Sequence, residues 1–245
     1  MFTGMIKEVG KLNKISRVNT GLEIEVSSLL LTKDMKSGDS IAVNGCCLTV
    51  NSFTSGKSFK ADVSFSTLKT TTFRFLRSGN YVNLEDAVKF NDKLGGHMVS
   101  GHIDCIGKII KILKKGDFYL LEIKIPKDII ALAAPKGSLS VDGISLTISD
   151  SLNALISFAI IPFTFENTNL KYKKQGEALN LEVDLMARYI LNMAKYGSPM
   201  SQGNFSGAGD YINILNMYKL NSDLQNKKNR DSELKEKLEK YGFKK

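Results

Sequence analysis

With 245 residues, of which 42% are hydrophobic and 24% charged, the chain has the composition of a globular protein with one large or two small domains. No apolar run reaches about 18 residues and no basic segment precedes an apolar one at the N-terminus, so we expect neither a membrane span nor a signal peptide. The net charge of +9 is spread along the chain and interleaved with acids, which argues against a nucleic-acid partner.

The chain repeats itself at a spacing of about 97 residues. Four blocks of the first half match four blocks of the second in the same order: 3–12 with 100–109, 43–50 with 141–148, 64–68 with 161–165, and 79–86 with 176–183. A period this long indicates a duplicated domain rather than a solenoid, whose repeats run about 20–50 residues. We therefore expect domains at 1–97 and 98–184.

Each half consists of segments that alternate apolar and polar residues or are rich in strand-forming residues. In the first half these segments are 21–26, 40–50, 58–64 and 81–88, and in the second half they are 118–126, 138–149, 155–162 and 178–184. Several short strands per half predict a small antiparallel barrel or sandwich in each.

The pattern changes after residue 184. Residues 185–196 carry apolar side chains at helical spacing and predict a helix, with Leu185, Tyr189 and Met193 as candidate packing positions. Residues 197–245 begin as a Gly/Ser-rich linker and continue as a polar, helix-prone tail, to which the sequence assigns no role.

The three cysteines are Cys46, Cys47 and Cys105, and they form neither a disulfide framework nor a zinc-binding pair. We expect reduced thiols and a cytoplasmic location. With only two histidines in the chain and no familiar ligand spacing, we expect no metal site.

The duplication is chemically asymmetric at one histidine. When the repeats are aligned, His102 falls on Met5, so only the second half offers an imidazole that titrates near neutrality at this position. His97 precedes the second repeat, and we interpret it as a structural residue. Similar pockets with different titratable groups would handle similar ligands in different roles.

The blocks NGCCLTV and DGISLTI place small polar side chains at matching positions. On a strand, Cys47 and Thr49 share one face, as do Ser145 and Thr147. A single copy would be an ordinary strand, but two matching copies favour a polar-lined pocket in each half.

These residues carry a family resemblance. The blocks MFTG, NGCCLTV, GGHMVSGHID, DGISLTI and NLEVDLMARYI resemble riboflavin synthase of the alpha-chain type over about residues 1–196. The resemblance implies an all-β fold of two homologous six-stranded antiparallel β-barrels in tandem, followed by a C-terminal α-helix that contributes to a homotrimer.

The resemblance also implies an activity. One molecule of 6,7-dimethyl-8-ribityllumazine would donate a four-carbon unit to a second, giving riboflavin and 5-amino-6-(D-ribitylamino)uracil without a cofactor. The active site would lie between the first barrel of one protomer and the second barrel of its neighbour. Association with lumazine synthase is a partnership that the sequence does not decide.

The family motifs also assign site residues by position. His102, Cys47 and Ser40 would be catalytic, with His102 handling a proton. The substrate would contact Gly4, Met5, Ile6, Cys47, Leu48, Thr49, Asp62, Val63, Ser64, Phe65, Ser66, Thr67, Gly101, His102, Ile103, Lys136, Ser145, Leu146, Thr147, Ile160, Ile161, Pro162, Phe163 and Thr164.

Two positions depart from the family pattern. Ser66 stands where relatives commonly carry Glu, and Phe163 where they commonly carry His or Glu, so we carry over backbone contacts but not the family's side-chain contacts at these two positions. The alternative function is that of a lumazine protein, which holds a lumazine or flavin without converting it. The joint presence of Ser40, Cys47 and His102 favours the enzyme.

Overall fold

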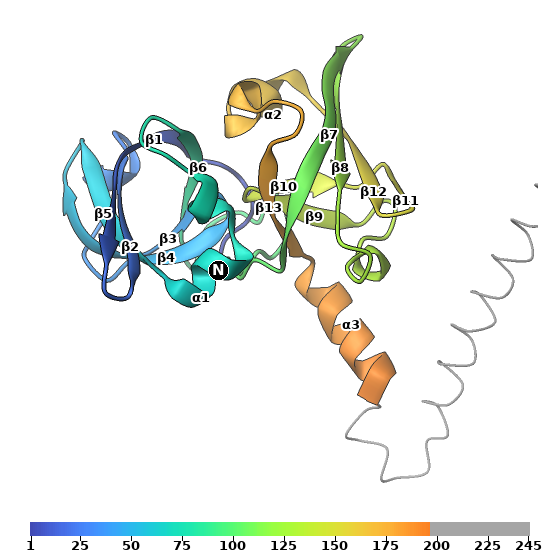
Figure 1. The fold of residues 1–245 in the computed structure, drawn as a ribbon, viewed down its shortest axis with the longest axis horizontal. Coiled ribbons are helices and arrows are strands. Elements are labelled where there is room, and N and C mark those ends of the chain that lie inside the picture. The colour runs from blue at the N-terminus through green and yellow to red at the C-terminus, as the bar shows by residue number, and fades with distance from the viewer. Residues whose placement is uncertain (197–245) are drawn as a thin grey trace, which may run out of the picture. The chain divides into compact units, whose positions relative to one another are not determined.

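The first half of the chain closes into an antiparallel barrel (Figure 1). Around the barrel the strands follow the order β1-β2-β5-β4-β3-β6. Their bounds are β1 (Glu8–Val18), β2 (Gly21–Ser27), β3 (Ser40–Val43), β4 (Cys46–Thr54), β5 (Ser58–Ser64) and β6 (Tyr81–Asp86). The helices of this half are η1 (Leu31–Lys33), α1 (Phe65–Thr70) and η2 (Thr72–Phe75).

The second half repeats this topology in a sheet ordered β10-β9-β13-β7-β8-β12-β11. Its strands are β7 (Cys105–Lys115), β8 (Phe118–Lys124), β9 (Ser138–Val141), β10 (Ile144–Thr147), β11 (Asp150–Leu152), β12 (Leu155–Ile160) and β13 (Ala178–Val183). Helices η3 (Ile130–Leu132), α2 (Pro162–Glu166) and η4 (Asn169–Tyr172) complete it.

The second sheet has seven strands where the first has six, because the strand equivalent to β4 is divided into β10 and β11. β10 and β11 pair with the equivalents of the two partners of β4, and only residues 148–149 separate them. The β4–β5 register of the first barrel shifts at the matching place, between Val50 and Ser52. The expected pair of six-stranded barrels is therefore confirmed, with one strand divided at a bulge.

Each half has its own hydrophobic core, built from the inward side of alternating strands. Along β5, Phe59, Ala61 and Val63 are buried between more exposed neighbours, and Phe158 occupies an equivalent interior in the second half. Each large apolar side chain that is buried in these cores contributes about 1.5–3 kcal/mol to the free energy of folding. The outward residues of the same strands are free to build a site.

The two halves touch through a pair of hairpin turns. Asn44-Gly45 joins β3 to β4, Asp142-Gly143 joins β9 to β10, and all four residues have positive φ, which Asn-Gly and Asp-Gly turns favour. A Cβ added to Gly45 would lie 2.6 Å from the backbone nitrogen of Gly143. The close approach of the turns therefore requires glycine.

Buried asparagines connect these turns in a two-fold pattern. The backbone amide nitrogen of Asn83 donates to Asn44 Oδ1 (2.8 Å), and the backbone amide nitrogen of Asn180 donates to Asp142 Oδ1 (2.7 Å). Each side chain then reaches across: Asn83 Nδ2 donates to the carbonyl of Asp142 and Asn180 Nδ2 to that of Asn44, both at 2.9 Å. The halves are fixed by hydrogen bonds that the duplication supplies twice.

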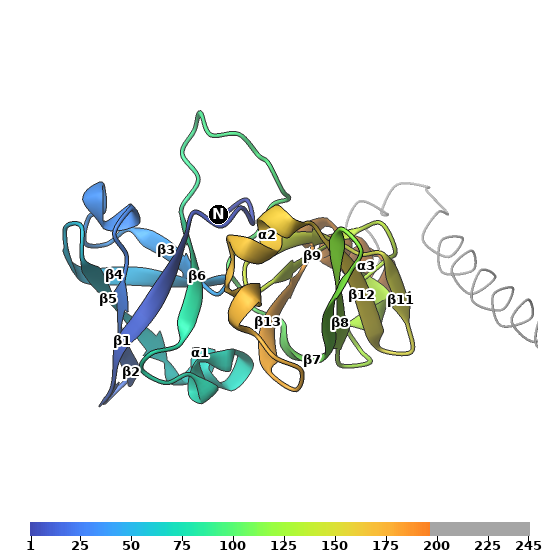
Figure 2. The ribbon, with the colours of Figure 1, turned by 90° about the horizontal axis from the view of Figure 1, so that it is seen from above.

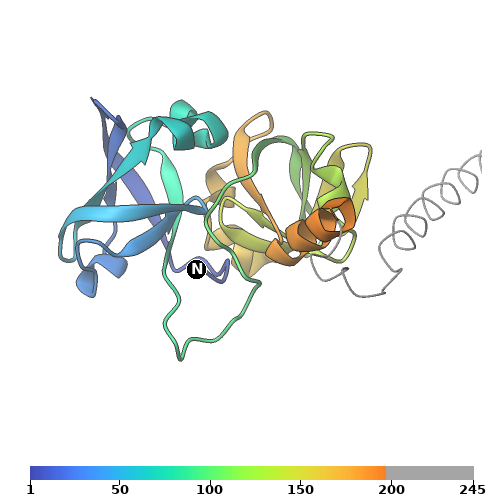
Figure 3. The same cartoon turned by 90° about the horizontal axis from the view of Figure 1, so that it is seen from below.

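The N-terminal segment lies beside the long connection between β6 and β7 (Figures 2 and 3). Phe2 and Val99 form an antiparallel bridge in which each amide donates to the other's carbonyl, at 2.8 and 3.1 Å. This contact places the segment that leads into each half next to its repeat counterpart.

The expected helix is α3 (Leu185–Tyr196). The structure describes residues 1–196, and the linker and helix-prone tail expected at 197–245 lie outside the described residues. Within the described part, no helix has the length and apolar character needed to cross a bilayer.

Candidate functional site

The predicted site segments are brought together crosswise between the repeats. The amide nitrogen of Ser145, in the second half, donates to the carbonyl of Gly4 at 2.8 Å. In the same way, the amide nitrogen of Cys47, in the first half, donates to the carbonyl of Gly101 at 2.9 Å. Two equivalent clusters result, and each cluster combines one segment of the first repeat with one segment of the second.

The apolar residues that follow the two glycines show the same exchange. Ile6 packs against the core of the second half, and Ile103 packs against the core of the first half. The glycines themselves have positive φ, and a Cβ on Gly4 or Gly101 would lie 2.6 or 2.5 Å from the Cβ of Ser145 or Cys47. The chain can pass this close to β10 and β4 only as glycine.

A buried glutamate holds each exchanged segment in place. Glu85 Oε1 accepts the backbone amide and hydroxyl of Thr3, both at 2.7 Å, and its Oε2 accepts the amide of Gly4 at 3.1 Å. Glu182 binds Ser100 and Gly101 in the same way, at 2.6 to 2.9 Å. Burial raises the pKa of Glu85, while its hydrogen bonds with Thr3 and Gly4 oppose the rise.

The polar residues of β4 and β10 face away from the barrel cores, as their spacing predicts. Cys47 and Thr49 alternate with the buried Cys46 and Leu48, and Ser145 and Thr147 alternate in the same way with buried neighbours. Ser40 begins β3 and is the register partner of Thr49. Ser40, Cys47 and Thr49 therefore share one outer face with the Gly101 segment.

His102 and Met5 occupy equivalent places in the two clusters, and both are exposed. Their amide nitrogens donate to the hydroxyls of Ser100 (3.4 Å) and Thr3 (3.2 Å), two residues earlier. The backbone thus presents an imidazole at one cluster and a thioether at the other. The asymmetry read from the sequence is present at the surface of the molecule.

His97, which we interpreted as structural, lies directly against a predicted substrate contact. Its Nδ1 is 2.7 Å from Ser145 Oγ, its amide nitrogen donates to the carbonyl of Thr3 at 3.1 Å, and only 9% of its surface is exposed. Burial lowers its pKa, although the charge of Asp184 opposes this effect. A neutral imidazole in this position can accept the hydroxyl proton of Ser145.

The sequence signal for His97 is that it is the first of the two glycine-preceded histidines in GGHMVSGHID. Comparison of the repeats cannot weigh it, because its counterpart would precede Met1.

The starts of α1 and α2 present apolar side chains to solvent. Ser64 caps α1 by accepting from the amide of Thr67, and its hydroxyl is 2.7 Å from that of Ser66. Phe65 is 59% exposed and Phe163, in α2, is 72% exposed. Uncovered aromatic rings are the kind of surface that a planar ligand or another protein buries.

The remaining predicted contacts differ in exposure. Asp62 is exposed, whereas Val63 and Ile160 point into the barrel cores. Lys136 is exposed, has a φ of +65°, and occupies the position of Gly38 in the first repeat.

Two features of the described residues limit the chemistry. Burial raises the pKa of the Cys46 and Cys105 thiols to about 12, so neither supplies a thiolate near neutrality. Within residues 1–196, no three His, Cys, Asp or Glu side chains are grouped to hold a metal ion. The clusters therefore offer imidazole, hydroxyl and backbone groups, together with the Cys47 thiol.

Comparisons with known proteins agree with these observations. Residues 3–87 and 100–184 each match the family profile of the lumazine binding domain. The riboflavin synthase of Actinobacillus pleuropneumoniae is 43% identical over 190 residues, which cover 78% of this chain and 88% of that protein. The riboflavin synthase of Bacillus subtilis is 36% identical over the same shares.

Solved structures give the same result for the fold. The structure of LumP complexed with riboflavin superimposes with a TM-score of 0.70 at 28% identity, covering 75% of this chain and 99% of that one. LumP complexed with 6,7-dimethyl-8-(1'-D-ribityl) lumazine superimposes with a TM-score of 0.68 at 27% identity, over the same shares. Two lumazine-binding repeats and this degree of identity show that the chain belongs to the riboflavin synthase family.

Proposed function

We propose that this protein is a riboflavin synthase, a transferase that converts two molecules of 6,7-dimethyl-8-ribityllumazine into riboflavin and 5-amino-6-(D-ribitylamino)uracil. The observation that carries this proposal is the pair of equivalent clusters built by exchange of the Gly4 and Gly101 segments. A reaction between two identical molecules needs two similar half-sites. The relatives named riboflavin synthase support the same reaction.

The catalytic advantage would come from holding two reactants together. Correct alignment of two bound molecules can lower the activation barrier by about 7–11 kcal/mol in favourable cases. The atoms of two lumazines add up to those of the two products, so the transfer needs no external oxidant. The proposed reaction therefore depends on positioning and proton transfer.

The asymmetry of the two clusters gives each a separate role. His102 is exposed in one cluster and would move a proton of the lumazine bound there, a task that Met5 cannot perform in the other. Cys47 and Ser40, on the same outer face, would hydrogen-bond the ligand or activate the attacking group. Ser145, with its hydroxyl against His97, is the matching polar group of the other cluster.

We further propose a homotrimer in which the first barrel of one protomer meets the second barrel of its neighbour. Met186, Tyr189, Ile190 and Met193 form an apolar stripe on α3, and each is more than half exposed in the single chain. Residues at this spacing lie on one face of the helix, and an apolar face of this kind is unfavourable to leave exposed to water. The free cysteines fit a reducing, cytoplasmic environment.

The alternative is a binding protein without turnover, because the superimposed LumP structures hold lumazine and riboflavin. Incubation of the purified protein with 6,7-dimethyl-8-ribityllumazine alone separates the two functions. The proposal predicts that riboflavin fluorescence grows catalytically and is unchanged by a metal chelator. Stable, saturable lumazine binding without riboflavin formation would establish the alternative.

A further inference from the structure

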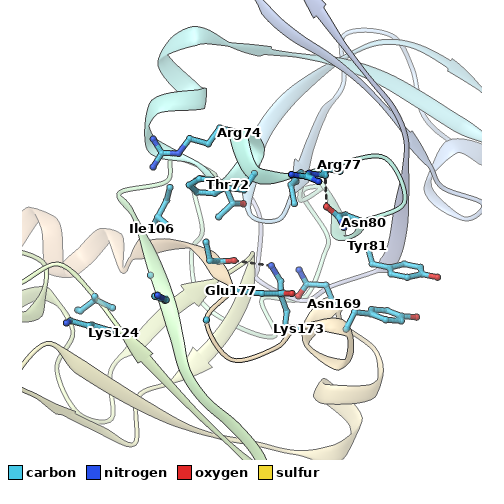
Figure 4. A pocket seen from close by; sticks show the side chains of 18 of the residues that line it. Thr72, Arg74, Arg77, Asn80, Tyr81, Ile106, Lys124, Asn169, Lys173 and Glu177 are labelled. Atoms are coloured by element: carbon cyan, nitrogen blue, oxygen red, sulfur yellow. Dashed lines mark hydrogen bonds between the residues drawn. The ribbon is translucent and has the colours of Figure 1, made fainter.

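A cavity of about 990 Å³ lies where η2 of the first half faces β7, β8 and β13 of the second (Figure 4). None of the predicted lumazine-site residues lines it. Its lining contains one acidic residue, Glu177, and five basic ones: Arg74, Arg77, Lys108, Lys124 and Lys173. Lys173 is 3.0 Å from the buried Asp142 carboxylate, so four cations remain for another partner.

The cavity lining differs between the two repeats. At one end of its lining, Tyr81 and Tyr172 stack with ring centroids 3.8 Å apart and planes 13° apart. Their repeat counterparts are Ala178 and Phe75, and alanine offers no ring to stack on. Phe75 is left 55% exposed, with the Arg74 guanidinium carbon 4.7 Å from its ring centroid.

The wall also contains a polar group without a partner. Thr72 lines the cavity and is buried, and its Oγ1 has no hydrogen-bond partner among the described residues. Its counterpart, Asn169, is fully engaged with the buried asparagines and Asp142. A buried hydroxyl left without a partner costs about 1–3 kcal/mol.

We propose that this cavity binds a small aromatic molecule that carries one or two phosphates, such as a nucleoside diphosphate. Arg77, Lys108 and Lys124 would bind the phosphates, and Phe75 would contact the ring. The volume is at the upper end of the range for small-ligand sites. A nucleic-acid strand would instead need a continuous basic groove with a series of exposed stacking rings.

Isothermal titration calorimetry of the full chain with ADP, adenosine and pyrophosphate tests the proposal, because these probes are not lumazines. ADP should bind at least about tenfold more tightly than adenosine, and pyrophosphate should compete. Lys108→Ala should weaken ADP binding about tenfold, the value of one charge-assisted hydrogen bond. Ala178→Tyr, which restores the tyrosine found in the first repeat, should fill the cavity and weaken binding at least as much.

Lys114→Ala is the matched control, because Lys114 is exposed on the same strand and lies outside the cavity lining. It should change ADP affinity less than about twofold, since it removes only a distant surface charge. Lumazine conversion should persist in all three variants, so this test is independent of the proposed reaction. Should Ala178→Tyr fail to fold, Lys108→Ala with its control still decides.

Three results would overturn the proposal: no saturable ADP binding, equal losses in Lys108→Ala and Lys114→Ala, or much tighter binding of a short single-stranded RNA than of ADP.

Discussion

His102 gives the two equivalent clusters different chemistry. It is exposed at one cluster, whereas Met5 occupies the same place at the other. The sequence alone identified this asymmetry, because both positions lie inside a repeated block. His97 escaped the same reasoning because it has no counterpart, and only the folded chain shows its ring against Ser145.

Replacing His102 by glutamine should lower turnover by roughly 10²–10⁴-fold, the usual contribution of general acid–base catalysis. Glutamine retains hydrogen bonding but cannot titrate, so lumazine affinity should fall much less. Met5→Gln is the matched control and should leave turnover nearly unchanged. Single-turnover kinetics with ligand titration measures both quantities, and equal losses of binding and turnover would show a positioning role instead.

His97 should make stability depend on pH. Because burial lowers its pKa below the ordinary value of 6.5, the unfolded chain binds a proton that the folded chain resists. Its contribution is therefore present above pH 6.5 and is lost as the pH falls through the lowered folded pKa, at up to about 1.4 kcal/mol per pH unit. Thermal unfolding measured at a series of pH values between 7.5 and 5 tests this dependence.

In His97→Gln the fall in stability below pH 6.5 should be shallower than in the parent protein. Since His102 and the carboxylates are common to both proteins, the difference between the two profiles isolates His97. Parallel profiles would mean that His97 titrates normally and is open to water.

At the scale of elements, the strands with clean alternation were predictable and the irregular ones were not. The segments 58–64 and 178–184 alternate regularly, and they fold as β5 and β13. The pattern did not identify β1 and β7, because a register shift breaks the period of two between Leu12 and Lys14 and between Ile109 and Lys111. The crossing of Gly4 and Gly101 depends on long-range pairing that local pattern does not contain.

The contact between the hairpin turns offers an element-scale prediction. Asp142 is fully buried, and Lys173, whose side chain is 10% exposed, is its ion-pair partner at 3.0 Å. Lys173→Met should reduce the free energy of unfolding by about 3–5 kcal/mol, because it leaves a buried charge uncompensated. Chemical denaturation measures this change.

Asp142→Asn in the Lys173→Met background is the matched comparison, because the first repeat already carries asparagine at the equivalent position, Asn44. The second substitution should recover part of the lost stability by removing the stranded charge. No recovery in the double variant would show that the ion pair is not what holds this contact.

At the scale of the whole molecule, we propose that the site is completed by association of protomers. The stripe formed by Met186, Tyr189, Ile190 and Met193 is the surface that would drive this association. Met186→Glu combined with Ile190→Lys should yield monomers that bind lumazine but convert it slowly. Sedimentation velocity alongside the riboflavin assay measures both properties, and a monomer with full activity would disprove the shared site.

We propose that two identical lumazines react with each other on this protein. The most direct test is to quantify substrate and both products by chromatography during turnover of 6,7-dimethyl-8-ribityllumazine alone. We predict that two lumazines disappear for each riboflavin and each 5-amino-6-(D-ribitylamino)uracil formed. One lumazine consumed per riboflavin, or riboflavin formed only after another carbon donor is added, would contradict it.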